Sequence, residues 1–190
     1  MDSTLIAELI VHLGRTASGD DSNDGLTSGQ WAVLRYFARA NRFSRTPSAF
    51  AAFHGTTRGT ASQAIKSMIA AGYLRQARSQ TDGRSVRLDL TDKARAIISL
   101  DPRKALTQAA DALPPGVRGH FSEILQHMLA HVASATGKPL FGTCENCAQF
   151  EGGDCCAQTP PAPLCRYLNE PLAEEDLGAL CINFSPEDAP

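Results

Sequence analysis

The residue types best suited to chemistry in this sequence are six cysteines, and they are confined to one end of the chain. All of them lie between residues 144 and 181, and the first 143 residues contain none. Clustered cysteines in a reducing compartment typically bind metal or carry out redox chemistry, whereas disulfide bonds form mainly outside it. The start of the sequence has no basic stretch ahead of its apolar residues, so we expect a cytoplasmic protein and rank disulfides behind a metal centre.

The spacing of the cysteines indicates which of them bind. Cys144 and Cys147 form a C-x-x-C pair, a turn in which two thiolates can hold one metal centre. Further along the chain, Cys165 and Cys181 complete a set of four ligands. Two adjacent thiolates cannot easily bind one small ion, so the neighbouring pair of cysteines is left out of this set. Either member, Cys155 or Cys156, could substitute for one of the four or act as a redox thiol.

The kind of centre follows from the same spacing. A zinc site typically uses two C-x-x-C pairs and this segment has one, whereas iron–sulfur clusters tolerate long, irregular ligand spacing. The run C-x2-C, 17 residues, C-x15-C, with a Phe three residues after its second and last cysteines, is similar to that of high-potential iron–sulfur proteins. That resemblance implies a [4Fe-4S] cluster; a [2Fe-2S] cluster and a structural zinc are the alternatives. The apolar shell, which could equally be a small core, would comprise Phe141, Phe150, Leu164, Leu168, Leu180 and Phe184.

Charge divides the chain into two parts. Residues 1–137 carry 16 basic and 11 acidic residues, and residues 138–190 carry 2 basic and 9 acidic residues. The basic excess is concentrated between residues 35 and 95, with 12 basic against 3 acidic residues. A basic region attracts a polyanion, because neutralised phosphates release their counterions. We therefore predict two domains, a basic one at 1–137 and a cysteine-rich, metal-binding one at 138–190.

The apolar periodicity of the basic part predicts a mainly α-helical (α+β) domain. Helical spacing predicts helices at 3–16, 28–40, 47–54, 57–72 and 115–135, and another at 91–113 with a bend at Asp101-Pro102. Alternating apolar residues around an Asp-Gly turn predict a β-hairpin formed by 73–78 and 85–90. A helix-turn-helix followed by a two-stranded wing is a geometry used to read DNA.

With these elements placed, the chain resembles the MarR family of winged-helix transcription regulators over residues 3–135. The resemblance is carried by LTSGQWAVLRYFA (26–38), HGTTRGTASQAIKSMIAAGYL (54–74) and TDGRSVRLDLT (81–91). The family's wing signature corresponds to Asp82, Arg84, Leu90 and Thr91. The resemblance implies a homodimer, intertwined through its first and last helices, that binds a pseudo-palindromic operator in double-stranded DNA. It also implies that Asp82 orients an arginine of the wing through an ion pair.

Two groups of polar residues are predicted to contact this DNA. On the second helix of the helix-turn-helix, Arg58 could pair with guanine or Gln63 with adenine. In the wing, Arg84 is best placed to enter the minor groove, whereas Arg78 and Arg87 are expected to contact phosphates. The full predicted set is Thr56, Thr57, Arg58, Gly59, Thr60, Ser62, Gln63, Lys66, Arg78, Asp82, Gly83, Arg84, Ser85 and Arg87. Four further arginines could lie near the DNA backbone or simply solvate the surface: Arg35, Arg39, Arg42 and Arg45.

These features predict a MarR-type transcriptional regulator, a repressor, whose iron–sulfur cluster senses redox state, iron or a reactive small molecule and alters operator affinity. Two alternatives remain open: a regulator with a structural zinc and a small-molecule effector in the dimer crevice, or a dimeric electron-transfer or metal-storage protein. An enzyme is not expected, because Ser/His/Asp motifs, a P-loop and G-x-G-x-x-G are absent from the sequence. A membrane partner is not expected either, because no stretch of about 18 apolar residues occurs.

Overall fold

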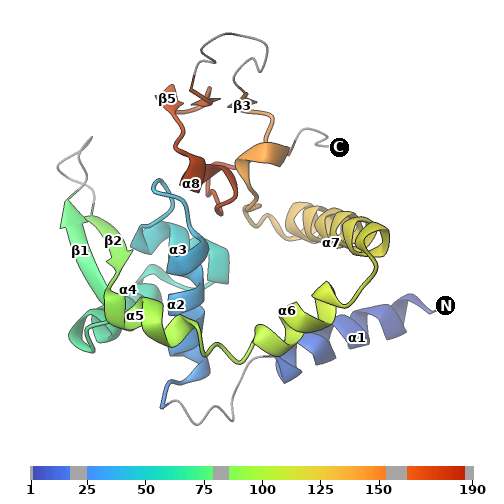
Figure 1. Ribbon diagram of the computed structural model, residues 1–190, viewed down its shortest axis with the longest axis horizontal. Helices are drawn as coiled ribbons and strands as arrows, with labels where there is room; N and C mark the ends of the chain where they lie inside the picture. Colours follow the sequence, from blue (N-terminus) through green and yellow to red (C-terminus); the bar gives the residue numbers. More distant parts are fainter. Residues whose placement is uncertain (1, 18–24, 79–85, 153–161, 187–190) are drawn as a thin grey trace.

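The computed structural model of the protein describes residues 2–17, 25–78, 86–152 and 162–186. Their helices and strands form a winged helix, a group of peripheral helices and a small cysteine-rich unit (Figure 1). The winged helix and the peripheral helices together comprise α1 (Ser3–Thr16), α2 (Ser28–Arg39), α3 (Pro47–His54), α4 (Arg58–Ala70), β1 (Leu74–Arg78), β2 (Val86–Leu90), α5 (Asp92–Ile98), α6 (Lys104–Asp111) and α7 (Pro115–Thr136). The cysteine-rich unit comprises η1 (Cys144–Asn146), β3 (Phe150–Glu151), β4 (Leu164–Cys165), β5 (Glu170–Pro171) and α8 (Glu174–Leu177). The predicted mainly helical winged-helix fold is confirmed.

The helices of the winged helix begin where a threonine can cap them. The hydroxyls of Thr27, Thr46 and Thr57 each accept the backbone N–H three residues further on, which satisfies one of the free donors at a helix N-terminus. Gly55 ends α3 with a φ of 60°, a left-handed conformation that glycine adopts without steric cost. Local residue chemistry therefore sets the boundaries that periodicity had predicted.

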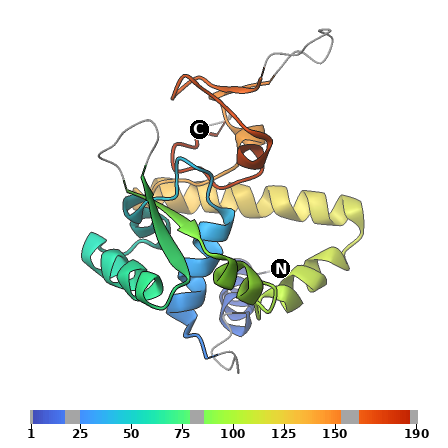
Figure 2. The same cartoon turned by 60° about the vertical axis from the view of Figure 1, so that its left-hand side comes forward.

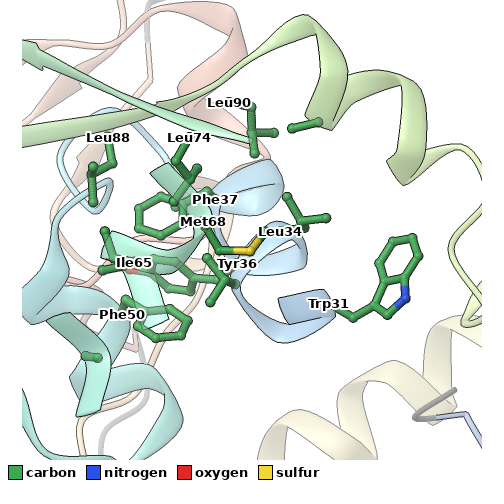
Figure 3. Packing of buried hydrophobic residues seen from close by; sticks show 14 of the residues in the cluster. Trp31, Leu34, Tyr36, Phe37, Phe50, Ile65, Met68, Leu74, Leu88 and Leu90 are labelled. Carbon is green, nitrogen blue, oxygen red and sulfur yellow. The ribbon is translucent and has the colours of Figure 1, made fainter. Parts of the chain in front are cut away.

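α2 forms the centre of the hydrophobic core (Figure 3). Its Trp31 and Leu34 are fully buried, and its Tyr36 and Phe37 pack against Phe50 of α3 with ring centroids 5.4 and 5.9 Å away. The core is completed from α4 and the wing by Ile65, Met68, Leu74, Leu88 and Leu90. Burying one such side chain contributes roughly 1.5–3 kcal/mol, so this cluster alone can hold the winged helix together.

The wing is an antiparallel hairpin that packs on this core. β1 pairs with β2 in a register that places Leu74 opposite Leu90 and Gln76 opposite Leu88. The backbone N–H of Leu88 also donates to the carbonyl of Arg45 at 2.9 Å, which ties the wing to the segment between α2 and α3. We call that segment, residues 40–46, the α2–α3 connector.

The long helix predicted after the wing is instead two helices. α5 ends at Ile98 and α6 begins at Lys104, so the prediction of one bent helix over 91–113 was wrong in its continuity. Pro102 lacks an N–H and disfavours a helical conformation at Asp101, which accepts the backbone N–H of Arg103 at 2.8 Å instead. Asp101 also binds Arg35 of α2, and this contact fixes the break against the core.

α1, α6 and α7 lie away from the wing and bury little (Figures 1 and 2). None of the residues of α1 or α6 is buried, and Ala133 is the buried residue of the 22-residue α7. The large apolar residues left exposed are Leu5, Ile6, Leu9, Ile10, Val11 and Leu13 on α1, Leu106 on α6, and Val117, Phe121, Ile124, Met128, Leu129 and Val132 on α7. Across the described residues, no helix is both long and apolar enough to span a membrane.

The cysteine-rich unit lies beside α2 and α3 (Figure 2). Its strands form one antiparallel sheet in the order β3-β4-β5, and isolated bridges join Gly142 to Cys181 and Cys147 to Pro186. A third bridge, between Ala40 and Leu180, joins the unit to the α2–α3 connector. The unit is therefore docked on the winged helix by backbone pairing as well as by side chains.

Candidate metal centre and candidate nucleic-acid interface

The four cysteines predicted as ligands line a single small pocket. Cys144, Cys147, Cys165 and Cys181 come from η1, from the residue that follows η1, from β4 and from the segment after α8. The other lining residues are Thr143, Gln149, Phe150, Leu172 and Asn183. The fold thus brings together thiols that are up to 37 positions apart in the sequence. The alternatives Cys155 and Cys156 lie outside the described residues.

Backbone hydrogen bonds hold each thiol in place. The N–H of Cys147 donates to the carbonyl of Cys144 at 3.1 Å, which closes the C-x-x-C turn. Cys165 lies opposite Phe150 in the β3-β4 pair. The N–H of Cys181 donates to the carbonyl of Gly142 at 2.9 Å. Three separate backbone pairings therefore converge on the pocket.

The thiols of this pocket interact electrostatically. Burial, and after it the other three cysteines and Asp176, raise the pKa of Cys144 to about 11. Burial likewise raises the pKa of Cys181, against the nearby Asn41 side chain and the backbone of Asn183, which lower it. Four thiolates would repel one another here, so a cationic centre is what could keep them ionised together.

The donor set of this pocket is four cysteine sulfurs with the apolar Phe150 and Leu172 beside them. Among the described residues, no group of three or more His, Cys, Asp or Glu side chains is arranged to hold a metal ion. A single zinc would draw four sulfurs to about 2.3 Å from one point, whereas a cluster offers each thiolate a separate iron. By residue type, the pocket fits either centre.

Only part of the predicted apolar shell surrounds the cysteines. Phe150 lines the pocket, and Phe184 packs on Gly142, the partner of Cys181. Phe141 instead packs edge-on against Phe53 of α3, with ring centroids 4.9 Å apart, so it joins the winged-helix core. Leu172, which the sequence did not single out, is buried against the cysteines because β5 delivers it there.

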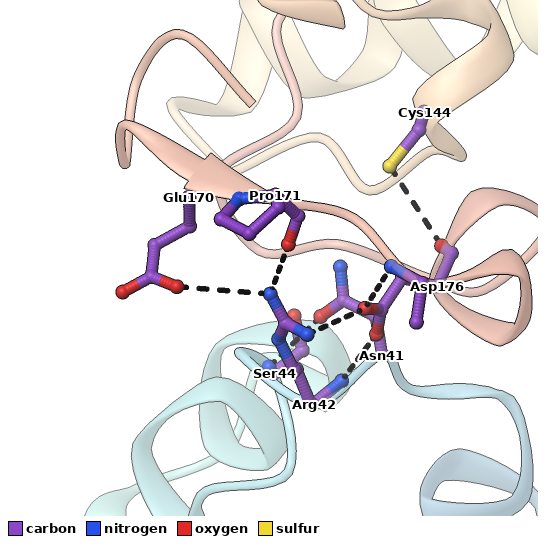
Figure 4. Close-up of polar contacts among 8 residues, drawn as sticks. Asn41, Arg42, Ser44, Cys144, Glu170, Pro171 and Asp176 are labelled. Atoms are coloured by element: carbon purple, nitrogen blue, oxygen red, sulfur yellow. Dashed lines mark hydrogen bonds and ion pairs between the residues drawn. The ribbon is translucent and has the colours of Figure 1, made fainter. Parts of the chain in front are cut away.

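Arg42 and Asp176 join the cysteine-rich unit to the α2–α3 connector (Figure 4). Asp176 is 2% exposed, and its carboxylate accepts the backbone N–H of Arg42 at 3.2 Å and pairs with the Arg42 guanidinium at 3.4 Å. The same guanidinium donates to the carbonyl of Pro171 and pairs with Glu170 at 3.8 Å. The thiol of Cys144 donates to the Asp176 carbonyl at 3.7 Å. One residue thus contacts both the connector and a predicted ligand.

The acidic stretch 170–176 is solvated only in part. Glu174 and Glu175, at the start of α8, are exposed to water. Asp176 is buried instead, and Glu170 faces Arg42. The stretch therefore works as a docking surface for a basic side chain.

The predicted DNA-contacting residues of the helix-turn-helix lie along α4. Arg58, Gln63 and Lys66 are exposed there, as are Gly59 and Thr60, whereas Ser62 and Thr56 are half-buried. Thr57 caps the helix through its bond to the Thr60 N–H at 3.1 Å, so its hydroxyl already has a structural partner. The exposed residues that start α4 leave its N-terminal N–H groups facing solvent, an arrangement that can receive a phosphate.

The wing is described only in part. Arg78 closes β1, and Arg87 on β2 is half-buried and lies 3.5 Å from Asp89. Asp82, Gly83, Arg84 and Ser85, the tip of the predicted wing, lie outside the described residues. Their predicted contacts therefore stay predictions.

Three of the four further arginines are already engaged within the chain. Arg35 binds Asp101 through two side-chain nitrogens, with its shortest contact at 2.6 Å. Arg42 is held by Asp176, and Arg45 donates to the Ala40 carbonyl at 3.0 Å and pairs with Asp89 at 3.3 Å. These three arginines therefore fasten elements of the chain together, a role that the sequence did not predict.

The sequence itself matches a known family across the winged helix. Residues 24–85 match the profile of the MarR family. This segment runs from the residues ahead of α2 to the end of the wing loop, which is where the sequence patterns of helix-turn-helix and wing lie. Among curated proteins, none matches the chain.

Solved structures of that family share the fold. A MarR transcriptional regulator from Methanosarcina mazei Go1 superposes with a TM-score of 0.52 at 20% identity, covering 70% of this chain and 99% of the other. A MarR protein from Peptoclostridium difficile gives 0.54 at 19% identity, covering 71% and 91%. Streptococcus pneumoniae FabT, solved in complex with DNA, gives 0.51 at 20% identity, covering 70% and 99%. The matched segment and these superpositions show that the chain has a winged-helix fold similar to that of MarR regulators.

Proposed function

We propose that this protein is a DNA-binding transcriptional regulator of the MarR type. One observation carries the proposal. The helix-turn-helix and wing match the MarR family profile in sequence, and α4 exposes Arg58, Gln63 and Lys66. Arginine and glutamine are the side chains that read guanine and adenine in the major groove, and lysine suits a phosphate. The FabT structure, which contains DNA, shows a chain of this fold used in that way.

The protein acts as a homodimer in this proposal. The apolar residues on α1 and α7 have no cover within the described chain, and Leu129 is 63% exposed. A continuous apolar face of this kind in a water-exposed helix typically lies in an interface. A two-fold dimer would place its two α4 helices on successive half-sites of a pseudo-palindromic operator.

The cysteine-rich unit gives the regulator its sensor. We propose that Cys144, Cys147, Cys165 and Cys181 hold a [4Fe-4S] cluster, which when bound supplies a change of charge and a sensitivity to oxidants. The four cysteines around one apolar pocket support this proposal. A structural zinc with a small-molecule effector is the second candidate, since four thiolates also suit zinc.

The docking contacts give the sensor a route to the DNA-contacting elements. Cys144 contacts Asp176, Asp176 binds Arg42 of the α2–α3 connector, and Arg45 of the same connector binds the wing strand β2 through Asp89. A change in the cysteine site that displaced Asp176 would therefore act on the segment between α2 and the helix-turn-helix. Operator affinity falls when the two half-sites are no longer matched, so a small displacement suffices.

The DNA proposal is tested by a gel-shift titration. The probe is a duplex selected from a random library by the wild-type protein, and the variant is Arg58→Ala. Loss of a bidentate arginine contact costs about 1–3 kcal/mol, so affinity should fall at least tenfold, while Arg118→Ala on α7 serves as a matched control of exposed charge. Unchanged affinity for Arg58→Ala would refute the assigned interface.

The cofactor proposal is tested on anaerobically purified protein. Iron, acid-labile sulfide and zinc are measured, and the absorption spectrum is recorded. A brown wild-type protein that contains iron and acid-labile sulfide would support the cluster, provided that a Cys165→Ser variant loses both. A colourless protein with one zinc per chain favours the second candidate, and retained regulation after Cys→Ser changes would then point to a small-molecule effector.

A further inference from the structure

Asn41 is a buried polar residue of the winged helix that lies at the cysteine site. It belongs to the α2–α3 connector and is 1% exposed. No pattern in the sequence marks it, since it sits between Ala40 and Arg42 in an ordinary connector. A buried polar residue normally has every hydrogen-bonding group satisfied, so any group left over calls for an explanation.

Two hydrogen bonds hold Asn41, one through its side chain and one through its backbone (Figure 4). Its Oδ1 accepts the backbone N–H of Ser44 at 3.0 Å, and its own backbone N–H donates to the carbonyl of Leu180 at 2.9 Å. These bonds leave the Nδ2 amide without a partner. Among the described residues, two buried side-chain nitrogens lack one, and Asn41 Nδ2 is one of them.

The residue that lies beside Asn41 in the neighbouring segment is Cys181. The residues on either side of Cys181 are both fastened to the connector: the N–H of Leu180 donates to the carbonyl of Arg39 at 2.7 Å, and the N–H of Ile182 donates to Ser44 Oγ at 2.8 Å. Cys181 is thereby held against Asn41. Ala40 and Leu180 form a parallel bridge, so the residues that follow them, Asn41 and Cys181, lie side by side in neighbouring segments.

We propose that Asn41 Nδ2 donates a hydrogen bond to Sγ of Cys181 when that sulfur is a ligand of the metal centre, so that the winged helix itself tunes the centre. The inference rests on the proposed cysteine-ligated cluster. A metal-bound thiolate has no proton and accepts a donor that a neutral thiol accepts poorly, which accounts for the unpartnered amide. Asn41 is a positioning residue, because it acts through Cys181.

The donor has a measurable consequence for the reduction potential. Hydrogen bonds to cluster sulfurs stabilise the more negative, reduced state and raise the potential. Removing the Asn41 donor should therefore lower the reduction potential of the centre. The same hydrogen bond joins Cys181 to the α2–α3 connector, so the potential and the docking of the unit depend on one side chain.

The test compares three variants of the full-length protein after anaerobic reconstitution with iron and sulfide. Asn41→Leu is close in shape, neutral and without a donor. Asn41→Asp keeps an oxygen for the Ser44 N–H and also lacks the donor. Tyr167→Leu is the control, because it changes a 64% exposed side chain of the same cysteine-rich unit and leaves Asn41 and its contacts intact. Iron and sulfide content and the reduction potential are measured for each.

We expect both Asn41 variants to bind the cluster with a reduction potential lower than that of the wild type, and Tyr167→Leu to retain the wild-type value. A shift in Asn41→Asp alone would reflect the added charge and would overturn the inference. Equal potentials in all three variants would overturn it too. A wild-type protein that takes up no iron and sulfide would instead refute the cluster, and the inference would fall with it.

Discussion

The ring of Phe184 lies directly against the α-carbon of Gly142. A Cβ added at Gly142 would lie 2.5–2.6 Å from three carbons of that ring, closer than side chains tolerate. Gly142 also accepts the backbone N–H of Cys181 at 2.9 Å, so the absence of a side chain here lets an aromatic ring approach the backbone beside a predicted ligand. Glycine is therefore required by packing, since its φ is not in the left-handed region.

Gly142→Ala should open the cysteine site. The added methyl group displaces the Phe184 ring, and the reconstituted cluster should then lose its colour in air several-fold faster than in the wild type. The loss of absorbance with time is the measurement. Gly178→Ala is the matched control, because a Cβ at Gly178 meets nothing within 4 Å and the residue belongs to the same unit. Equal rates for the two variants would contradict the role assigned to Phe184.

Arg42→Met should uncouple the sensor from the DNA-contacting elements. The change leaves the buried Asp176 carboxylate without its ionic partner, and breaking such a pair costs about 3–5 kcal/mol, so the cysteine-rich unit should detach from the α2–α3 connector. The variant is expected to bind operator with the same affinity in its metal-bound and metal-free forms. Gel shifts on both forms provide the measurement. A wild-type difference between the two forms that persisted in Arg42→Met would show that coupling follows another route.

Leu129→Glu should convert the dimer to a monomer. Leu129 is 63% exposed on α7, and a carboxylate buried in an apolar interface without a partner is strongly unfavourable. Light scattering after size-exclusion chromatography gives the mass directly. The control is Tyr167→Glu, which alters a residue 64% exposed on the cysteine-rich unit and should leave the dimer intact. A dimeric Leu129→Glu protein would place the interface elsewhere.

Asp101→Asn should destabilise the winged helix in a pH-dependent way. Burial by itself raises the pKa of Asp101, but hydrogen bonds from Arg35 and the Arg103 backbone, with the charges of both arginines, hold the pKa below its usual value. Because the folded-state pKa is depressed, this stabilisation is present above the unfolded pKa of about 3.9 and is lost as pH falls through the folded value.

The expected loss for Asp101→Asn at pH 7 is about 1–2 kcal/mol, measured by urea unfolding. The difference from the wild type should shrink as pH falls below about 4, where the wild-type carboxylate also becomes protonated. Asp111→Asn, which removes an exposed pair with Arg118, should change stability by at most about 0.5 kcal/mol. A pH-independent difference for Asp101→Asn would mean that the ionised carboxylate contributes nothing.

Much of the winged helix could be predicted from sequence because its signals are local. Thr57 caps α4 and Gly55 ends α3 through contacts within a few residues, and the alternation of Leu88 and Leu90 shows which face of β2 packs inward. The continuity of residues 91–113 was mispredicted, although Pro102 signalled a bend. What separated the two helices was the contact of Asp101 with Arg35, 66 positions away in the sequence.

The four cysteines were also identifiable from their type and spacing, since few residues serve as soft metal ligands. Their meeting around one pocket, however, depends on η1, on the β3-β4 pair and on the bridge between Gly142 and Cys181. The candidate ligands could therefore be predicted from residue type, but their proximity depends on the folded chain.

The sequence by itself determined the helix-turn-helix and wing, their capping residues and the set of candidate ligands, because each depends on short-range periodicity or on the chemistry of single residues. The tertiary structure decided that Arg35, Arg42 and Arg45 fasten elements together, that Asp176 is buried, and that Asn41 of the winged helix lies beside Cys181. These relationships join residues 44 to 140 positions apart. Charge and hydropathy patterns carry no information about such partners, since they emerge only when distant segments pack against one another.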